Sequence, residues 1–198
     1  MWFRQDLRLA DNPALCAACE RGDIIPVYIL DDDGADSWKM GGASRWWLHH
    51  ALADLNSSLK QGLLLFEGDA LTILRDLAAQ TNASAIVWNR CYEPWRITRD
   101  ATLKTALKSD GLTVESFNGS LLWEPWQVLK KDGTPYKVFT PYYRRGCLSS
   151  ATPRRPMAVP ESIEIAQDSV RSLSLEALNL PPKINWDTQM IARWDISE

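Results

Sequence analysis

The residues best suited to chemistry lie in a polar run near the start of the chain, Arg4-Gln5-Asp6-Leu7-Arg8. The run follows an apolar start, Met1-Trp2-Phe3, and precedes Asn12 and Pro13, which suit the N-cap and first position of a helix. This order predicts a strand, a polar loop and a helix, and in open α/β sheets ligands bind outside the carboxyl ends of strands. The loop offers donors, acceptors and charge for one polar ligand. Its charges could equally pair only with each other, and composition does not decide between these readings.

Similar polar groups follow other predicted strands. The carboxylate cluster Asp31-Asp32-Asp33-Gly34 comes after the apolar run 24–30, and the loop Asn89–Trp95 comes after residues 85–88. The cluster could face a ligand or form a solvated turn. Ser44 and Arg45 lie in the first turn of a predicted helix, where unpaired N–H groups favour anions. An arginine at this place predicts either an acidic or carbonyl-rich ligand or an acidic partner on the neighbouring loop.

The common catalytic and nucleotide-binding motifs are absent from the sequence. There is no GxGxxG, no GxxxxGK[ST] and no GxSxG pattern. The four cysteines fit no zinc spacing, and His49 and His50 are adjacent in the middle of a predicted helix. We therefore expect the polar loops to bind a ligand rather than to break bonds.

Composition limits the class of protein. The chain has 198 residues, 45% of them hydrophobic, and a net charge of −3. This excludes a disordered chain and a general nucleic-acid binder, although Tyr142–Arg145 is a local basic candidate. No apolar run reaches the roughly 18 residues of a membrane helix, and no signal peptide is visible. We expect a cytoplasmic protein with no membrane partner.

The spacing of apolar residues predicts five strands alternating with four helices. The strands are expected near residues 1–3, 24–30, 63–66, 85–88 and 113–117, and three of the helices at 43–60, 70–80 and 94–109. This predicts an α/β fold, a doubly wound five-stranded parallel sheet of Rossmann-like order 3-2-1-4-5. In helix 43–60 an apolar stripe is expected at Trp47, Leu48, Ala51, Leu52, Leu55 and Leu59.

The two ends of the chain look unusual for such a domain. A central strand normally has about five or six residues, so we expect the first strand to be truncated. After Phe117 a short helix is predicted at 141–148, and from Thr152 the chain is punctuated by prolines without sustained periodicity. We expect a domain over residues 1–150 and an extended interdomain linker over 151–198 that stops before a further domain.

Four stretches resemble one protein family. WFRQDLRLADNPAL at the start, GGASRWWLHHALADL at 41–55, WNRCYEP at 88–94 and YKVFTPYYR at 136–144 are similar, in order and spacing, to the N-terminal domain of the DNA photolyase/cryptochrome family. The resemblance covers essentially the whole chain. It is nearest to the bacterial class I photolyases, which act on cyclobutane pyrimidine dimers.

The resemblance implies a light-harvesting role. In this family the N-terminal domain holds an antenna chromophore (a deazaflavin, a methenyl-folate or FMN) that passes excitation to FAD in a C-terminal helical domain. That domain also binds damaged DNA, so the expected partners are the C-terminal FAD domain and, through the full-length protein only, DNA. The fragment alone is not expected to be an active lyase.

The resemblance also implies which residues hold the chromophore. The positions that match are Arg4, Asp6, Leu30, Asp31, Arg45, Asn89, Arg90, Tyr92 and Glu93. Folate-binding members of the enterobacterial type carry an Asn-Glu pair where this chain has Trp95 and Arg96. This departure favours a deazaflavin or flavin over that mode of folate binding.

Two other functions remain open at this stage. One is a cryptochrome-type photoreceptor fragment that binds protein partners, because the residues specific to repair would lie in the C-terminal half. The other is a free-standing nucleotide-binding α/β module of the universal-stress type, against which the extended linker argues.

Overall fold

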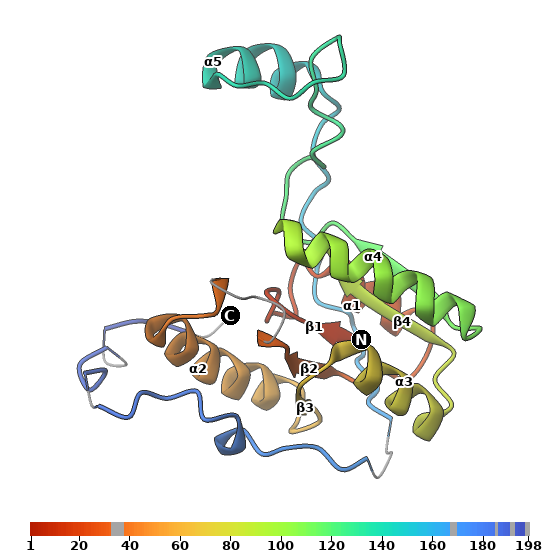
Figure 1. The fold of residues 1–198 in the computed structure, drawn as a ribbon, viewed down its shortest axis with the longest axis vertical. Coiled ribbons are helices and arrows are strands. Elements are labelled where there is room, and N and C mark those ends of the chain that lie inside the picture. The colour runs from red at the N-terminus through yellow and green to blue at the C-terminus, as the bar shows by residue number, and fades with distance from the viewer. Residues whose placement is uncertain (33–37, 167–169, 185, 191–192, 197–198) are drawn as a thin grey trace.

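The computed structural model describes residues 1–32, 38–166, 170–184, 186–190 and 193–196. Its centre is one sheet of five strands, all paired in parallel in the order β3-β2-β1-β4-β5. The strands are β1 (Trp2–Phe3), β2 (Val27–Leu30), β3 (Leu64–Glu67), β4 (Ala85–Asn89) and β5 (Thr113–Phe117) (Figure 1). The predicted fold class and strand order are confirmed.

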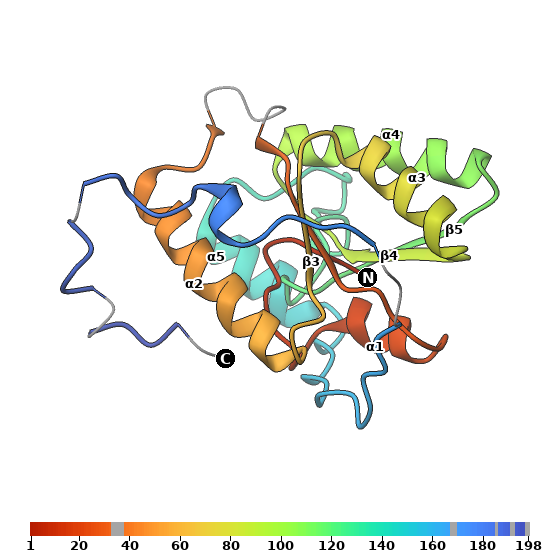
Figure 2. The same ribbon diagram turned by 90° about the horizontal axis from the view of Figure 1, so that it is seen from below.

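The helices cover both faces of the sheet. They are α1 (Pro13–Cys19), α2 (Gly42–Ser58), α3 (Ala70–Thr81) and α4 (Pro94–Ser109). Figure 2 shows α1 and α2 apart from α3 and α4, with the sheet between them. Two buried apolar clusters lie between the helices and the sheet, one beneath α1 and α2 and the other beneath α3 and α4. A parallel sheet buried on both faces explains why β2 reads as an unbroken apolar run.

Side-chain caps begin two of these helices. Asn12 accepts a hydrogen bond from the N–H of Leu15 at 3.0 Å, and Asp69 accepts one from the N–H of Thr72 at 2.8 Å. Without these side chains, the N–H groups of Leu15 and Thr72 would be unpaired donors at a helix start. The caps set where α1 and α3 leave the preceding loops.

The central strand β1 is short but fully enclosed. Trp2 pairs with Val27 on one side and Trp88 on the other, and Phe3 pairs with Tyr28. Trp2 and Phe3 are 1% and 0% exposed. The polar loop after β1 therefore starts from the middle of the sheet, which is where a doubly wound fold changes the direction of its connections.

The apolar stripe of α2 is confirmed except at its first member. Leu48, Ala51, Leu52 and Leu55 are buried, but the buried tryptophan is Trp46, whereas Trp47 is 41% exposed. Neighbouring residues of a helix point about 100° apart, so Trp46 and Trp47 do not share one face. The indole of Trp47 instead faces a crevice described below.

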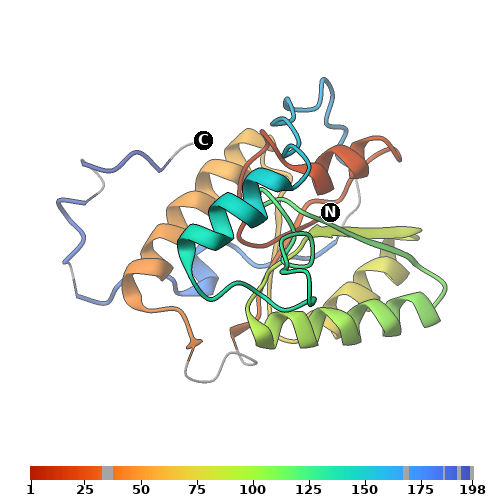
Figure 3. The same ribbon diagram turned by 90° about the horizontal axis from the view of Figure 1, so that it is seen from above.

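Beyond β5 the chain leaves the sheet as an arm, residues 120–152, with a helical tip (Figure 1). The single helix predicted at 141–148 is instead α5 (Phe139–Pro141), a π-helical turn (Tyr142–Gly146) and a 3₁₀ turn (Cys147–Ser149). Figure 3 views the molecule from the side of this arm.

The last part of the chain is extended, as predicted, but it packs against the domain. Residue Ile165 bridges Ile24 in parallel, and Leu173 bridges Leu65 in antiparallel fashion at the β3 edge. Beyond a 3₁₀ turn at Glu176–Leu178, Leu180 is 2% exposed. Among the described residues, the search for a membrane-spanning helix finds none of sufficient length and hydropathy.

Candidate functional site

A crevice of about 530 Å³ opens beyond the carboxyl ends of β1 and β2. The loop after β1 forms its floor with Arg4, Gln5, Leu7 and Arg8, and residues from α2 and the first turns of α4 form its two sides. A volume of this size lies within the range of small-molecule and cofactor sites. The crevice therefore occupies the place at which an open α/β sheet binds ligands.

One side of the crevice is apolar. Met40, Trp47, Leu48 and Ala51 contribute to it from α2 and the loop before it. The ring of Trp194 meets the ring of Trp47 edge-on, with the centroids 6.0 Å apart. A partly exposed indole beside aliphatic side chains is suited to stacking against a flat aromatic ligand.

On the opposite side, arginines of the floor and of α4 form ion pairs with aspartates. Arg4 pairs with Asp100 at 2.6 Å and also donates to the carbonyl of Asn89, while Arg99 pairs with Asp31 and, at 2.8 Å, with Asp100. Burial lowers the pKa of Arg99, and the adjacent carboxylate of Asp100 opposes this effect. These pairs hold two guanidinium groups in fixed positions at the wall of the crevice.

Tryptophan rings lie behind the same guanidinium groups. The Arg4 guanidinium carbon lies 4.8 Å from the ring centroid of Trp2, and that of Arg99 lies 5.1 Å from both Trp2 and Trp95. The negative face of an indole attracts a cation at this distance. These ring contacts help to hold the guanidinium groups of Arg4 and Arg99 in place.

Beneath the floor lies a buried polar network that joins the loops after β1 and β4. The Asn89 amide donates to Asp6 at 2.6 Å and to Asn12 at 2.7 Å, and Asp6 accepts the N–H of Arg4 at 2.8 Å. All three polar side chains are at most 3% exposed. Asp6 and Asn89 therefore position the loops but do not line the crevice.

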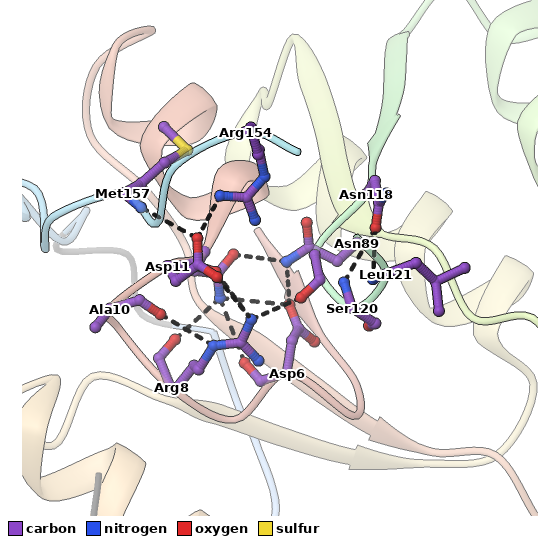
Figure 4. A network of polar contacts seen from close by, with 12 residues as sticks. Asp6, Arg8, Ala10, Asp11, Asn89, Asn118, Ser120, Leu121, Arg154 and Met157 are labelled. Carbon is purple, nitrogen blue, oxygen red and sulfur yellow. Dashed lines mark hydrogen bonds and ion pairs between the residues drawn. The ribbon is translucent and has the colours of Figure 1, made fainter. Parts of the chain in front are cut away.

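A second set of contacts ties the first loop to more distant segments (Figure 4). Arg8 donates to the carbonyl oxygens of Ala10, Asp11 and Gly119, at 2.6 to 3.0 Å. Asp11 in turn pairs with Arg154 and accepts the N–H of Met157 at 3.1 Å. The loop, the exit of β5 and the returning chain are thus held together.

Arg90 and Tyr92 lie on the far side of the β4 loop, toward the arm. Both bind Glu124, Arg90 at 2.5 Å and the Tyr92 hydroxyl at 2.9 Å, and Glu124 is 6% exposed. Burial and the bond to Glu124 raise the pKa of Tyr92 to about 12. These contacts attach the base of the arm and do not line the crevice.

The remaining predicted residues divide between the crevice and the core. Asp31 lines the crevice with Arg4, whereas Leu30 is buried in the sheet. Arg45 pairs with Asp32, which lines the crevice, and Glu93 accepts a hydrogen bond from Gln5 at 2.7 Å. The cluster residues Asp33 and Gly34 lie outside the described residues.

Several residues that line the crevice were not predicted as site residues, above all Tyr28, Trp47, Arg96 and Arg99. One signal could have found the two arginines. They are three positions apart at the start of a helix that follows a ligand-facing loop, so they share one face of that helix. Among the described residues no cluster of metal-ligating side chains is found.

Comparisons with known proteins agree with the fold. The family model for DNA photolyase matches residues 1–161. A deoxyribodipyrimidine photo-lyase from Agrobacterium fabrum is 44% identical over 100% of this chain, and cryptochrome-2 from Arabidopsis thaliana is 35% identical over 91%. The chain spans 42% of the length of the first protein and 30% of the second.

A solved structure extends the likeness to three dimensions. The crystal structure of a class III photolyase from Agrobacterium tumefaciens superposes with a TM-score of 0.89 at 44% identity, over 98% of this chain and 40% of that one. Its stated class is III, where the motifs pointed to class I. A match of the family model over most of the sequence, with the predicted strand order, shows the kinship: the chain belongs to the DNA photolyase family.

Proposed function

We propose that this chain is the light-harvesting domain of a photolyase and that the crevice holds a planar antenna chromophore. The observation that carries the proposal is a crevice with an apolar side ending in Trp47 and a polar side formed by the ion-paired Arg4 and Arg99. A flat pigment with polar edges matches both sides. Arg4 and Asp31 touch it directly in this proposal, and Arg45 and Glu93 orient neighbouring groups.

The rest of the proposed mechanism lies outside the chain. The pigment absorbs light and passes the excitation to FAD, which a C-terminal helical domain holds in the full-length protein. That domain binds damaged DNA and splits cyclobutane pyrimidine dimers. In this scheme residues 1–150 form the antenna domain, residues 151–198 form the connector, and the protein works in the cytoplasm.

The residues after the β4 loop favour one class of pigment in this proposal. Trp95 and Arg96 stand where the enterobacterial folate mode requires an Asn-Glu pair, and both belong to the first turn of α4. A deazaflavin or FMN is therefore proposed ahead of a methenyl-folate. The shared chemistry of all three is a fused, flat, nitrogen-containing ring system.

Direct binding tests the proposal. The purified chain is titrated separately with deazaflavin, FMN and methenyl-folate, and the pigment's absorbance and emission are recorded. At least one pigment should bind, and Trp47→Ala should weaken its binding about tenfold through loss of ring contact. Trp126→Ala is the matched control, because Trp126 is 61% exposed on the arm and does not line the crevice.

Two results would count against the proposal. One is a folded protein that binds none of the three pigments. The other is equal loss of binding in the Trp47 and Trp126 variants. Tight binding of ATP in place of a pigment would favour a free-standing nucleotide-binding module.

A cryptochrome-type photoreceptor is the second candidate, because the identity to cryptochrome-2 from Arabidopsis thaliana extends over most of this chain. Both functions would use the same crevice. The full-length protein distinguishes them: a photolyase restores cyclobutane dimers to pyrimidines under blue light, and a photoreceptor of the cryptochrome type does not.

A further inference from the structure

We propose that Arg96 selects crevice ligands that carry an anionic group, a phosphate or a carboxylate, beside the flat ring. The inference rests on the proposed function and deepens it, because it names the charge of the ligand and the residue that reads it. It starts from the way the arginines around the crevice are paired.

Three of these arginines already have a close carboxylate partner. Arg4 pairs with Asp100 at 2.6 Å, Arg99 pairs with Asp31, and Arg45 pairs with Asp32. Each pair largely neutralises the guanidinium that forms it. A ligand anion at any of the three would have to compete with a protein carboxylate that is already in contact.

Arg96 is paired differently. Its nearest carboxylate oxygen, on Glu93, is 3.6 Å away, and the same oxygen accepts a hydrogen bond from Gln5 at 2.7 Å. The Glu93 side chain is 41% exposed, so water screens its charge. The Arg96 Nη1 donates to the Sγ of Cys91 at 3.4 Å, a weak acceptor, and the buried Nε has no hydrogen-bond partner among the described residues. Arg96 thus keeps donor capacity and most of its charge.

The Arg96 side chain lies at the wall of the crevice, where its charge can act on a ligand. This side chain is only 16% exposed, and its guanidinium lies over Trp95 at 4.9 Å from the ring centroid, which restricts its motion. Arg96 lines the crevice together with Tyr28. Burial raises the pKa of Tyr28, and the charge of Arg96 opposes this rise. Tyr28 stays protonated at neutral pH.

The other arginine that lines the crevice, Arg8, is used elsewhere, because it donates to the carbonyl oxygens of Ala10, Asp11 and Gly119. Arg96 is therefore the guanidinium at the crevice best placed to favour an anion over a neutral ligand of the same shape. A guanidinium beside a phenol hydroxyl can bind two oxygens of one phosphate or carboxylate group.

A pair of flavins that differ only in one phosphate tests this inference. FMN and riboflavin share the ring and the ribityl chain, and binding of each is followed by quenching of flavin fluorescence. The wild-type chain should bind FMN at least about tenfold more tightly than riboflavin, since a charge-assisted hydrogen bond in a sheltered site has that effect. The preference should decrease as salt concentration rises.

Variants at Arg96 assign the preference to one residue. Arg96→Gln should weaken FMN binding about tenfold and leave riboflavin binding unchanged, whereas Arg96→Lys should keep part of the preference because it keeps the charge. Arg75→Gln is the matched control, since Arg75 lies on α3, pairs with Asp110 at 2.6 Å and does not line the crevice. Unchanged riboflavin binding also shows that the variant is folded.

The possible results distinguish failure of this inference from failure of the proposed function. If both flavins bind equally in the wild type, or if Arg96→Gln weakens both equally, this inference is wrong and the proposed function stands. If no pigment binds at all, both are wrong. If the folate is the pigment that binds, the comparison is made between methenyl-tetrahydrofolate and its glutamate diamide, in which neither carboxylate is charged, and equal binding of these two would overturn the inference.

Discussion

The side-chain amide of Asn89 donates to both Asp6 and Asn12 in a region that is closed to water. Asp6 also accepts from the backbone of Arg4, and Asn12 caps α1, so one amide connects two loops and a helix start. The crevice floor depends on this connection, although Asn89 does not itself line the crevice.

Replacing Asn89 with alanine should lower the free energy of unfolding by about 2–3 kcal/mol, because two buried acceptors lose their donor. Urea unfolding measures this. Asn118→Ala is the matched control: the Asn118 side chain accepts only the N–H groups of Ser120 and Leu121 at an exposed turn. We expect it to cost under about 1 kcal/mol. Equal losses in the two variants would show that burial of the Asn89 network adds nothing.

Individual side chains also show what the sequence could not predict. The types and places of Arg4, Asp31 and Arg45 indicated a polar site beyond the strands, and all three lie at or next to the crevice. Arg90 and Tyr92 come from an equally polar loop, yet they turn to Glu124, which is more than 30 positions away in the chain. A side chain in such a loop can point into the crevice or away from it, and the direction depends on a partner that is distant in the sequence.

Elements were easier to predict than side-chain directions. Buried parallel strands and amphipathic helices leave strong apolar patterns, and caps mark the helix starts, so the strand order followed from general connection rules. The exception within α2 is informative. Trp46 and Trp47 are adjacent and equally apolar, so the apolar pattern alone did not decide which of them faces the core.

The cap of α3 gives a prediction with a pH dependence. The hydrogen bonds from Thr72 lower the pKa of Asp69 below its ordinary value of 3.8. A lowered pKa in the folded state means that the carboxylate stabilises the fold fully above the unfolded pKa and progressively less as pH falls below it. Asp69→Ala should therefore lower stability by about 1 kcal/mol at pH 7, and by less near pH 2.

Asp69→Asn provides the control, because asparagine is also a good N-cap but does not titrate. Thermal unfolding of the wild type and the two variants between pH 2 and pH 7 makes the comparison. The difference in stability between the wild type and Asp69→Asn should change with pH only below about pH 4. A difference between the wild type and Asp69→Ala that is constant across this range would rule out the ionised cap as its source.

At the scale of the whole molecule, the connector belongs to the folded unit more closely than its sequence indicates. Residues from 151 onward show no periodicity, yet Leu178 and Leu180 are each 2% exposed and join the cluster beneath α2. Isolated leucines in an irregular segment carry no pattern from which burial can be predicted. The family model matches residues 1–161 and so ends before this contact.

Removing the connector should therefore uncover part of the core. We expect a chain ending at residue 161 to unfold at a lower urea concentration than residues 1–198, and to bind a dye for exposed apolar surface. Leu180→Ala in the whole chain should reproduce much of the loss, about 2–5 kcal/mol, because it leaves a cavity beneath α2. Leu173→Ala is the control from the same segment, since Leu173 is 39% exposed, and should change stability by under about 1 kcal/mol. If the shortened chain and Leu180→Ala both match the wild type, residues 162–198 lie against the domain without stabilising it.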